Sequence, residues 1–151
     1  MPSNVQRLQL TPMSSKLAES DVTGTRLAGI LAAAVIDTEL DSNGVLEATE
    51  GLPHRVWICF DDHKLLSFQS EMSFPEELAQ GVTLEAINDL NGSCMLVQFY
   101  WEGPNLRGFY NMSYDGGLDP RQFVKMLRHF TMAFIAGYIE LKSGVSNEVR
   151  A

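Results

Sequence analysis

The chain has 151 residues, of which 45% are hydrophobic and 20% are charged, and its formal net charge is −8. These values describe a globular protein of about one domain with a sizeable core, and they exclude a disordered or fibrous chain. Because an acidic surface without a basic cluster repels phosphate groups, we do not expect nucleic-acid binding.

The longest apolar runs, Leu27–Ile36 and Phe130–Leu141, are shorter than the about 20 residues that a membrane-spanning helix needs. Polar residues interrupt the N-terminal stretch, so no signal peptide is predicted there. Cys59 and Cys94 stand in strand-like segments and are expected to be buried thiols in a reducing compartment. We therefore expect a cytoplasmic protein that makes no membrane contact.

Residues 1–20 are polar and contain two prolines and several serines, so we predict a flexible N-terminal arm. A single domain is expected to occupy residues 21–144. Its first helix begins at Asp21 or Thr23, because both residue types cap helices. The apolar face of that helix is formed by Leu27, Ile30, Leu31, Ala34, Val35 and Ile36.

Asn43-Gly44 is a turn signal, and three short strands are predicted after it. Thr83 can cap a short helix that ends at Asn91-Gly92. The three strands are Val45–Thr49, Arg55–Phe60 and Leu65–Met72, with a tight loop at Asp61–Lys64 between the last two.

A hairpin is predicted over Met95–Tyr114, with its turn at Glu102–Asn105. In its first strand the large apolar residues Met95, Val97, Phe99 and Trp101 alternate with Gln98 and Tyr100. Period-two alternation with one more polar face is typical of an antiparallel sheet that is covered on one side only.

The last helix has the clearest start signal, because Asp119 can cap it, Pro120 fits its first position and Gln122 completes a capping box. We expect it to end near Gly144 and to leave residues 145–151 as a polar tail. Its main apolar face is formed by Phe123, Leu127, Phe130, Phe134, Tyr138 and Leu141.

The predicted order is therefore α-β-β-β-α-β-β-α. Strands in antiparallel runs with helices between and after them define an α+β domain, here with a sheet of about five strands and helices packed on one side.

Four apolar residues of the last helix, Met126, Met132, Ile135 and Ile139, lie outside its main apolar face. They cannot all face one sheet, and two explanations remain open. Either the first helix covers them within one molecule, or they form the seam of a homodimer or a groove for a partner's helix or strand.

The segment Glu39–Glu50 has acidic and polar residues at the spacing of a calcium-binding loop, with a helix expected before it. Gly51 and Pro53 would break the exiting helix that such a site requires. We interpret the segment as an Asn-Gly turn between helix and strand, with solvated acids around it.

The three histidines, His54, His63 and His129, have no metal-ligand spacing, and Asp61-Asp62-His63 is interpreted as a set of turn-forming residues. The sequence therefore predicts no catalytic residue, no metal site and no cofactor.

Several segments carry a resemblance to a known family. They are Asp41-Ser42-Asn43-Gly44-Val45, Ile87-Asn88-Asp89-Leu90-Asn91, the hairpin Met95–Tyr114, Gly116-Gly117 and the helix Phe123–Tyr138. Together they resemble the YbjN family, whose architecture is similar to that of type III secretion chaperones. The resemblance covers Thr23 to about Lys142; the N-terminal arm and the Pro-containing Glu102–Asn105 loop depart from it. It implies an α+β sheet with helices on one side, no established catalytic residues, and a regulatory or chaperone-like binding role in bacteria, often as a dimer.

We therefore expect a non-enzymatic cytosolic protein-binding domain that forms a homodimer and holds a protein or peptide client. The alternative is a small-ligand-binding protein or an enzyme, with a pocket between sheet and long helix near Trp101 and Tyr114. A calcium-responsive switch at Glu39–Glu50 is a third hypothesis.

Overall fold

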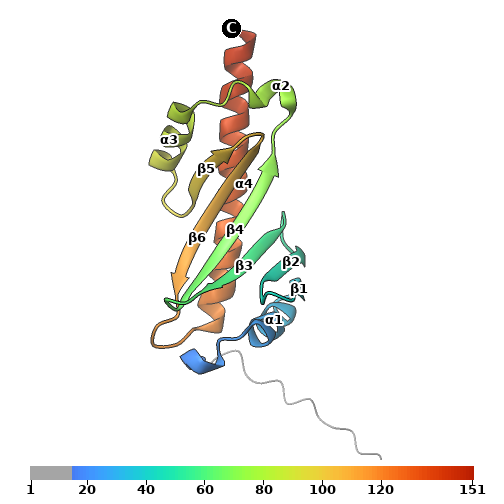
Figure 1. Cartoon of the computed structure of the whole chain (residues 1–151), viewed down its shortest axis with the longest axis vertical. Helices are drawn as coiled ribbons and strands as arrows, with labels where there is room; N and C mark the ends of the chain where they lie inside the picture. Colours follow the sequence, from blue (N-terminus) through green and yellow to red (C-terminus); the bar gives the residue numbers. More distant parts are fainter. Residues whose placement is uncertain (1–14) are drawn as a thin grey trace, which may run out of the picture.

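The computed structural model describes residues 15–151, so most of the predicted N-terminal arm lies outside the described residues. The fold is α+β, as predicted (Figure 1). Its elements are η1 (Glu19–Asp21), α1 (Gly24–Ala33), β1 (Asp37–Leu40), β2 (Leu46–Glu50), β3 (Val56–Asp61), β4 (Leu65–Ser73), α2 (Glu76–Ala79), α3 (Leu84–Ser93), β5 (Gln98–Glu102), β6 (Asn105–Ser113) and α4 (Pro120–Arg150).

The strands form one antiparallel sheet in the order β1-β2-β3-β4-β6-β5. It has six strands rather than about five, because β1 pairs with β2 across the Asn43-Gly44 turn.

The first helix was expected to continue to Ile36, but α1 ends at Ala33 and the chain turns at Val35, whose φ is 61°. Ile36 is fully buried after this turn and does not belong to the helix face.

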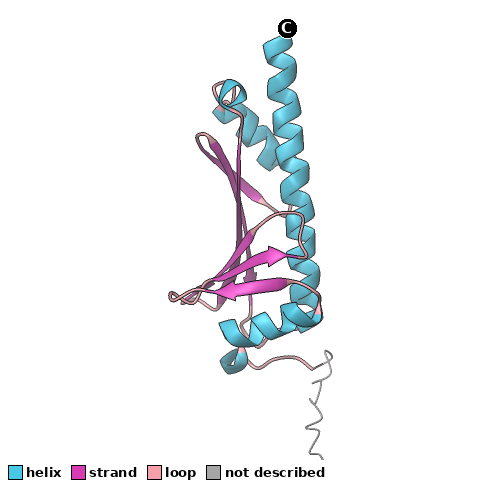
Figure 2. Cartoon of the chain, turned by 90° about the vertical axis from the view of Figure 1, so that its right-hand side faces the viewer, coloured by secondary structure: helices cyan, strands magenta, loops and turns pink. Residues whose placement is uncertain are grey.

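The long helix α4 lies along one face of the sheet (Figure 2). The strands alternate so that residues such as Ile58, Phe68 and Leu106 are fully buried beneath the helices. Close contact between the layers depends on two glycines. A Cβ on Gly108 would come within 2.7 Å of the Phe134 ring, and one on Gly137 would collide with the ring of Phe99.

The N-terminus of α4 forms as predicted, since Asp119 Oδ1 accepts hydrogen bonds from the N–H groups of Arg121 and Gln122. Its predicted end was wrong, because the helix continues through Gly144 to Arg150. Val145 is only 3% exposed, and it packs so closely on Gly81 that a Cβ there would lie 2.7 Å away. This packing holds the last turns in helical form despite the glycine, so residues 145–150 are not a tail.

Leu17 and Glu19 contact the domain, so the predicted arm does not extend to residue 20. Leu17 forms an antiparallel bridge with Leu118, and its side chain is buried. Glu19 forms an ion pair with Lys64 and accepts a hydrogen bond from the Gly116 N–H. The described N-terminal segment therefore clamps the β3–β4 turn to the loop before α4.

The edge strand β5 is closed by a side chain from α3. The Asn91 side chain donates to the Phe99 carbonyl over 2.8 Å and accepts from the Phe99 N–H over 2.7 Å. The amide thus makes the two hydrogen bonds that a neighbouring strand would make at that residue. This gives a physical reason for one residue of the Ile87–Asn91 segment on which the family resemblance depends.

Candidate functional site

The outward side of α4 carries an apolar patch that no described element covers. Met132 is 62% exposed and Ile139 is 56% exposed, while Ile135 is half-buried and Ala136 is exposed. These four residues follow one another at helical spacing, so they share one face; we call them the α4 outer patch. Met126, which the sequence placed with them, packs instead against the core.

The helix α1 does not cover this patch. It meets α4 near the start of the helix, where Arg128 Nη2 donates to the Ala34 carbonyl over 2.9 Å. Covering by α1 therefore does not account for the exposed residues Met132 and Ile139. Met126 is accounted for within the molecule, because it packs against the core.

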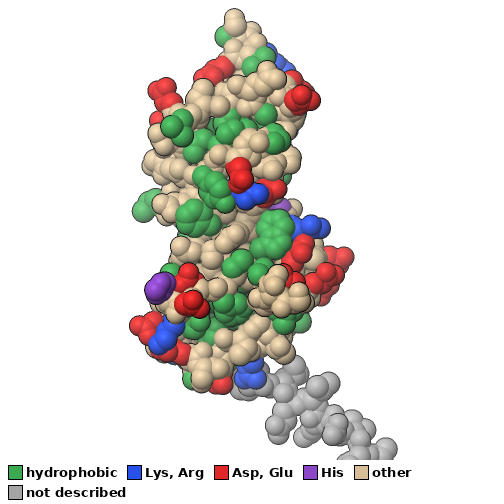
Figure 3. All heavy atoms as spheres, in the orientation of Figure 1, with side chains coloured by type: hydrophobic (Ala, Val, Ile, Leu, Met, Phe, Trp, Pro, Cys, Tyr) green, Lys and Arg blue, Asp and Glu red, His purple; other side chains and the backbone are tan. Residues whose placement is uncertain are grey.

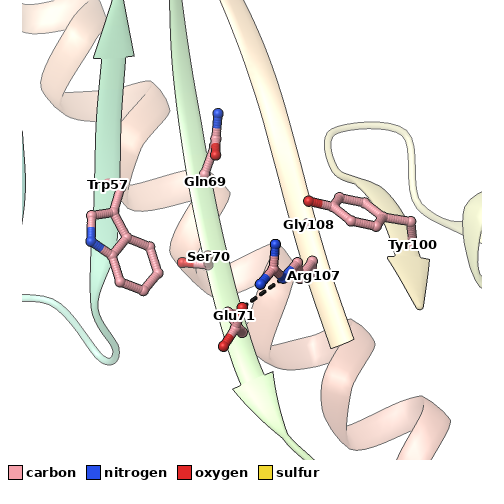
Figure 4. Close-up of a pocket in the computed structure, with 7 residues that line it drawn as sticks. All are labelled: Trp57, Gln69, Ser70, Glu71, Tyr100, Arg107 and Gly108. Carbon is pink, nitrogen blue, oxygen red and sulfur yellow. Dashed lines mark ion pairs between the residues drawn. The ribbon is translucent and has the colours of Figure 1, made fainter. Parts of the chain in front are cut away.

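The opposite face of the sheet, which we call the open face, carries a second candidate surface. Figure 3 looks onto this face and shows apolar side chains interrupted by charged pairs. Figure 4 shows a hollow there, with Trp57 from β3 on one side and Tyr100 from β5 on the other. Its volume is about 220 Å³, and Gln69, Glu71 and Arg107 lie between the two rings.

Two further hollows continue the first one. A hollow of about 490 Å³ shares Gln69 and Tyr100 with it. A third, of about 380 Å³, shares Phe109 and Asn111 with the second. The three together form one shallow depression that runs from β3 across β4 and β6 to β5 and the loop before it, and we call this depression the trough.

Arg107 lies at the centre of the first hollow and is held by two carboxylates. Its Nη1 lies 3.0 Å from Glu102 Oε2, and its Nε lies 2.6 Å from Glu71 Oε2. The Nε–H does not point at that oxygen, so this second contact is an ion pair without an aligned hydrogen bond. The Tyr100 hydroxyl, and then Glu71 and Glu102, raise the pKa of Arg107 above its ordinary value. The guanidinium therefore stays charged and already paired.

Sequence reasoning missed the trough, although a signal for it was present. The alternation that buries Val56 and Ile58 turns Trp57 and Cys59 to the other side. Trp57 and Phe109 are large apolar residues on the side of the sheet that was expected to be polar. Such residues indicate an uncovered surface that can bind a partner or ligand.

His54 is the histidine that the fold draws farthest into the structure. Its Nδ1 lies 2.9 Å from Ser70 Oγ, and its Nε2 lies 3.0 Å from the Thr131 carbonyl of α4. The ring also contacts Phe134, with 4.9 Å between ring centroids. Ser70 in turn donates to the Arg55 carbonyl over 2.7 Å. Histidine and serine are therefore both used in joining β3 and β4 to α4.

The Asp61-Asp62-His63 segment forms a turn, because Asp61 Oδ1 accepts a hydrogen bond from the His63 N–H over 2.7 Å. His129 is exposed on α4.

Burial raises the pKa of the Cys59 thiol, which disfavours the reactive thiolate. Across residues 15–151, no three or more His, Cys, Asp or Glu side chains are grouped so that they could hold a metal ion.

The segment Glu39–Glu50 is a β-hairpin in the structure, with strands rather than helices on both sides of the turn. Asp41 Oδ1 accepts hydrogen bonds from the N–H groups of Asn43 and Val45, so this carboxylate shapes the turn. Glu47 lies 2.8 Å from Arg55. The turn joins two strands and not a helix and a strand, which corrects the sequence interpretation.

The space between sheet and α4 near Trp101 is filled by packed aromatic side chains. Trp101 meets Phe74 edge to face at 5.3 Å, and Phe74 meets Tyr138 in the same way at 4.9 Å. Tyr114 packs against the same core. The hollows described above lie on the other face of the sheet.

Of the helices within residues 15–151, none combines the length and the apolar content that crossing a bilayer requires.

The geometry defines an α+β domain with one covered sheet face, one open face and a long helix with an apolar outer patch. Residues 23–141 match the YbjN family, which is described as "Putative bacterial sensory transduction regulator". The crystal structure of YbjN from E. coli, "a putative transcription regulator", matches with a TM-score of 0.65 and 13% identity, over 80% of this chain and 91% of that one. No curated protein gives a significant match.

The family match extends over most of the sequence, and the chain belongs to the YbjN family. At 13% identity the likeness to the E. coli structure shows the fold alone. The resemblance expected from the sequence is thereby confirmed.

Proposed function

We propose that this chain is a non-enzymatic regulatory domain of the bacterial cytoplasm that acts by binding protein, and that it pairs with a second copy through the α4 outer patch. The observation that carries the proposal is the exposure of Met132 and Ile139 on one face of a 31-residue helix. Exposed apolar side chains at this spacing are typical of helix–helix interfaces. The description of the family as a regulator supports a binding role over a catalytic one.

The symmetry of the patch fits a second copy as its occupant. In a two-fold antiparallel crossing centred between Ile135 and Ala136, Met132 of one copy lies opposite Ile139 of the other, because both residues are about one helical turn from the centre. Such a crossing buries the apolar side chains of both copies at its centre.

The test is the oligomeric state of an Ile139→Asp variant by light scattering coupled to size exclusion. We expect the wild type to elute at twice the chain mass and the variant at the chain mass, because a carboxylate in the seam would be buried without a partner. Gln122→Asp is the matched control, since it places the same charge on an exposed residue at the far end of α4. A wild type that is monomeric at all concentrations, or an Ile139→Asp variant with unchanged mass, would contradict the proposal.

A further inference from the structure

Two aromatic residues from strands that are not neighbours line the first hollow of the open face. Trp57 stands on β3 and Tyr100 on β5, and β4 and β6 lie between them in the sheet. Tyr100 is 41% exposed, and its ring is braced edge to face against Phe109 at 6.1 Å. An exposed aromatic ring that is already held in place, as Tyr100 is, binds flat or ring-shaped apolar groups at a small cost in entropy.

The shallow, continuous shape of the trough fits a chain segment better than a small molecule, because pockets for drug-sized ligands bury most of the ligand surface. The first hollow has a volume of about 220 Å³, and the neighbouring hollows extend it past Phe109 and Asn111. A segment in extended form can therefore place one side chain in the first hollow and continue along the trough.

The charges of the trough select against acidic segments. Arg107 is neutralised by Glu71 and Glu102, which together leave one negative charge in excess. Asp61 adds another in the second hollow. An acidic partner would meet repulsion, and it would find no free cation among the lining residues. An uncharged or weakly basic segment is complementary to this surface.

Polar side chains along the trough can bind a peptide backbone. Gln69, Gln98 and Asn111 are exposed there, and within the described residues Gln98 and Asn111 make no side-chain hydrogen bond. Each amide offers both donors and an acceptor. An extended backbone with free carbonyl groups, as in a polyproline II segment, can use these amides without forming a strand.

Addition of a partner strand to the sheet edge is disfavoured at both ends of the sheet. On β5, Asn91 occupies the hydrogen-bonding groups of Phe99. At the other edge, β1 is four residues long and carries Asp37 and Glu39, and short charged edge strands oppose pairing. A partner segment is therefore directed to the face rather than to an edge.

We propose that the trough binds an extended segment of another protein that contains proline and lacks acidic residues, with a proline ring seated in the first hollow, which Trp57 and Tyr100 line. Proline fits because its ring packs on aromatic faces, and its segment is already extended before binding. This inference rests on the proposed protein-binding function and names the class of partner segment. It concerns the open face, whereas dimerisation concerns α4.

The test is selection of random displayed peptides of about a dozen residues, which is long enough to span the trough, on the full chain. We expect enriched sequences to contain proline and to be depleted in Asp and Glu. A synthetic peptide of the enriched sequence should bind about tenfold more weakly to Trp57→Ala and Tyr100→Ala variants. Met132→Ser, which alters only the α4 outer patch, is the control and should bind as the wild type does.

Gln69→Lys keeps both rings and changes only an exposed residue of the trough, so it replaces the ring deletions in the test if these impair folding. The peptide is expected to bind about tenfold more weakly to this variant too. The proposal is overturned if no peptide is enriched, if enriched peptides are acidic or lack proline, or if Met132→Ser alone weakens binding. It is also overturned if raising the protein concentration without peptide shifts the NMR signals of trough residues, since a second copy would then occupy the face. Ile139→Asp should leave peptide binding intact, and Trp57→Ala should leave the dimer intact, so the two proposals fail separately.

Discussion

The two faces of the sheet are built from the same strands, yet they are chemically different. Towards α4 the strands present residues such as Ile58 and Phe68, which are fully buried. On the open face the same strands present Trp57, amides and ion pairs that water reaches. Because strand side chains alternate, a single run of residues specifies a packed surface and a binding surface at once. Substitutions on the open face are therefore expected to cost less stability than substitutions among the buried residues.

The largest effect is expected when a buried phenylalanine on the covered side of the sheet is replaced, and a phenylalanine on the open face provides the comparison. Phe134 is fully buried and stacks on Phe99 at 5.7 Å, so Phe134→Ala should lower the free energy of unfolding by about 3–5 kcal/mol. Phe109 is half-buried on the open face, and Phe109→Ala should cost about 1 kcal/mol or less. Urea denaturation measures both values. Equal losses would mean that the open face is covered in solution, and the contrast between the faces would be lost.

The next effect concerns the edge strand β5, where the covered side of the sheet borders solvent. Asn91→Ala removes both partners of the Phe99 backbone, and we expect a loss of about 2 kcal/mol in unfolding free energy. The Phe99 amide should also exchange with solvent faster. Asn88→Ala, on an exposed residue of the same helix, should change stability by no more than about 0.5 kcal/mol. If both variants behave alike, the closing role of Asn91 is refuted.

The smallest effect concerns a solvent-exposed contact at the end of the sheet. The Lys64 ammonium, followed by the Gly116 N–H, lowers the pKa of Glu19 from 4.5 to about 2. Because the folded pKa is depressed, the contact stabilises the folded chain above about pH 4.5, and this contribution disappears as the pH falls towards 2. The Gly116 amide proton should titrate in NMR spectra with a midpoint near 2. Lys64→Met should move that midpoint towards 4.5, and an unmoved midpoint would exclude the lysine as the cause.

Sequence patterns were sufficient for the elements with strong periodicity. The hairpin alternation and the cap at Asp119 predicted β5, β6 and the start of α4. The patterns failed where tertiary contacts override local preference. Burial of Val145 carries the helix past Gly144, and pairing with β2 makes a strand of the acidic segment Asp37–Leu40.

The candidate surfaces were predictable only in part. Helical spacing was enough to single out Met132 and Ile139 as residues outside the main apolar face. It could not show that Met126 reaches the core, since that depends on which elements pack around the start of α4. The trough was not predictable, because it combines residues of four neighbouring strands, and the order of strands in a sheet cannot be read from local patterns.

The missing side chain at Gly137 has a mechanical consequence. The Phe99 ring occupies the space that a Cβ at this position would take, and one turn away in either direction α4 presents a larger residue, Ala133 or Leu141. The helix therefore fits the sheet in a single axial position, because a shift by one turn would bring a larger side chain against the Phe99 ring. The outer surface of α4 therefore has a fixed axial position relative to the sheet, which is set when the two layers pack.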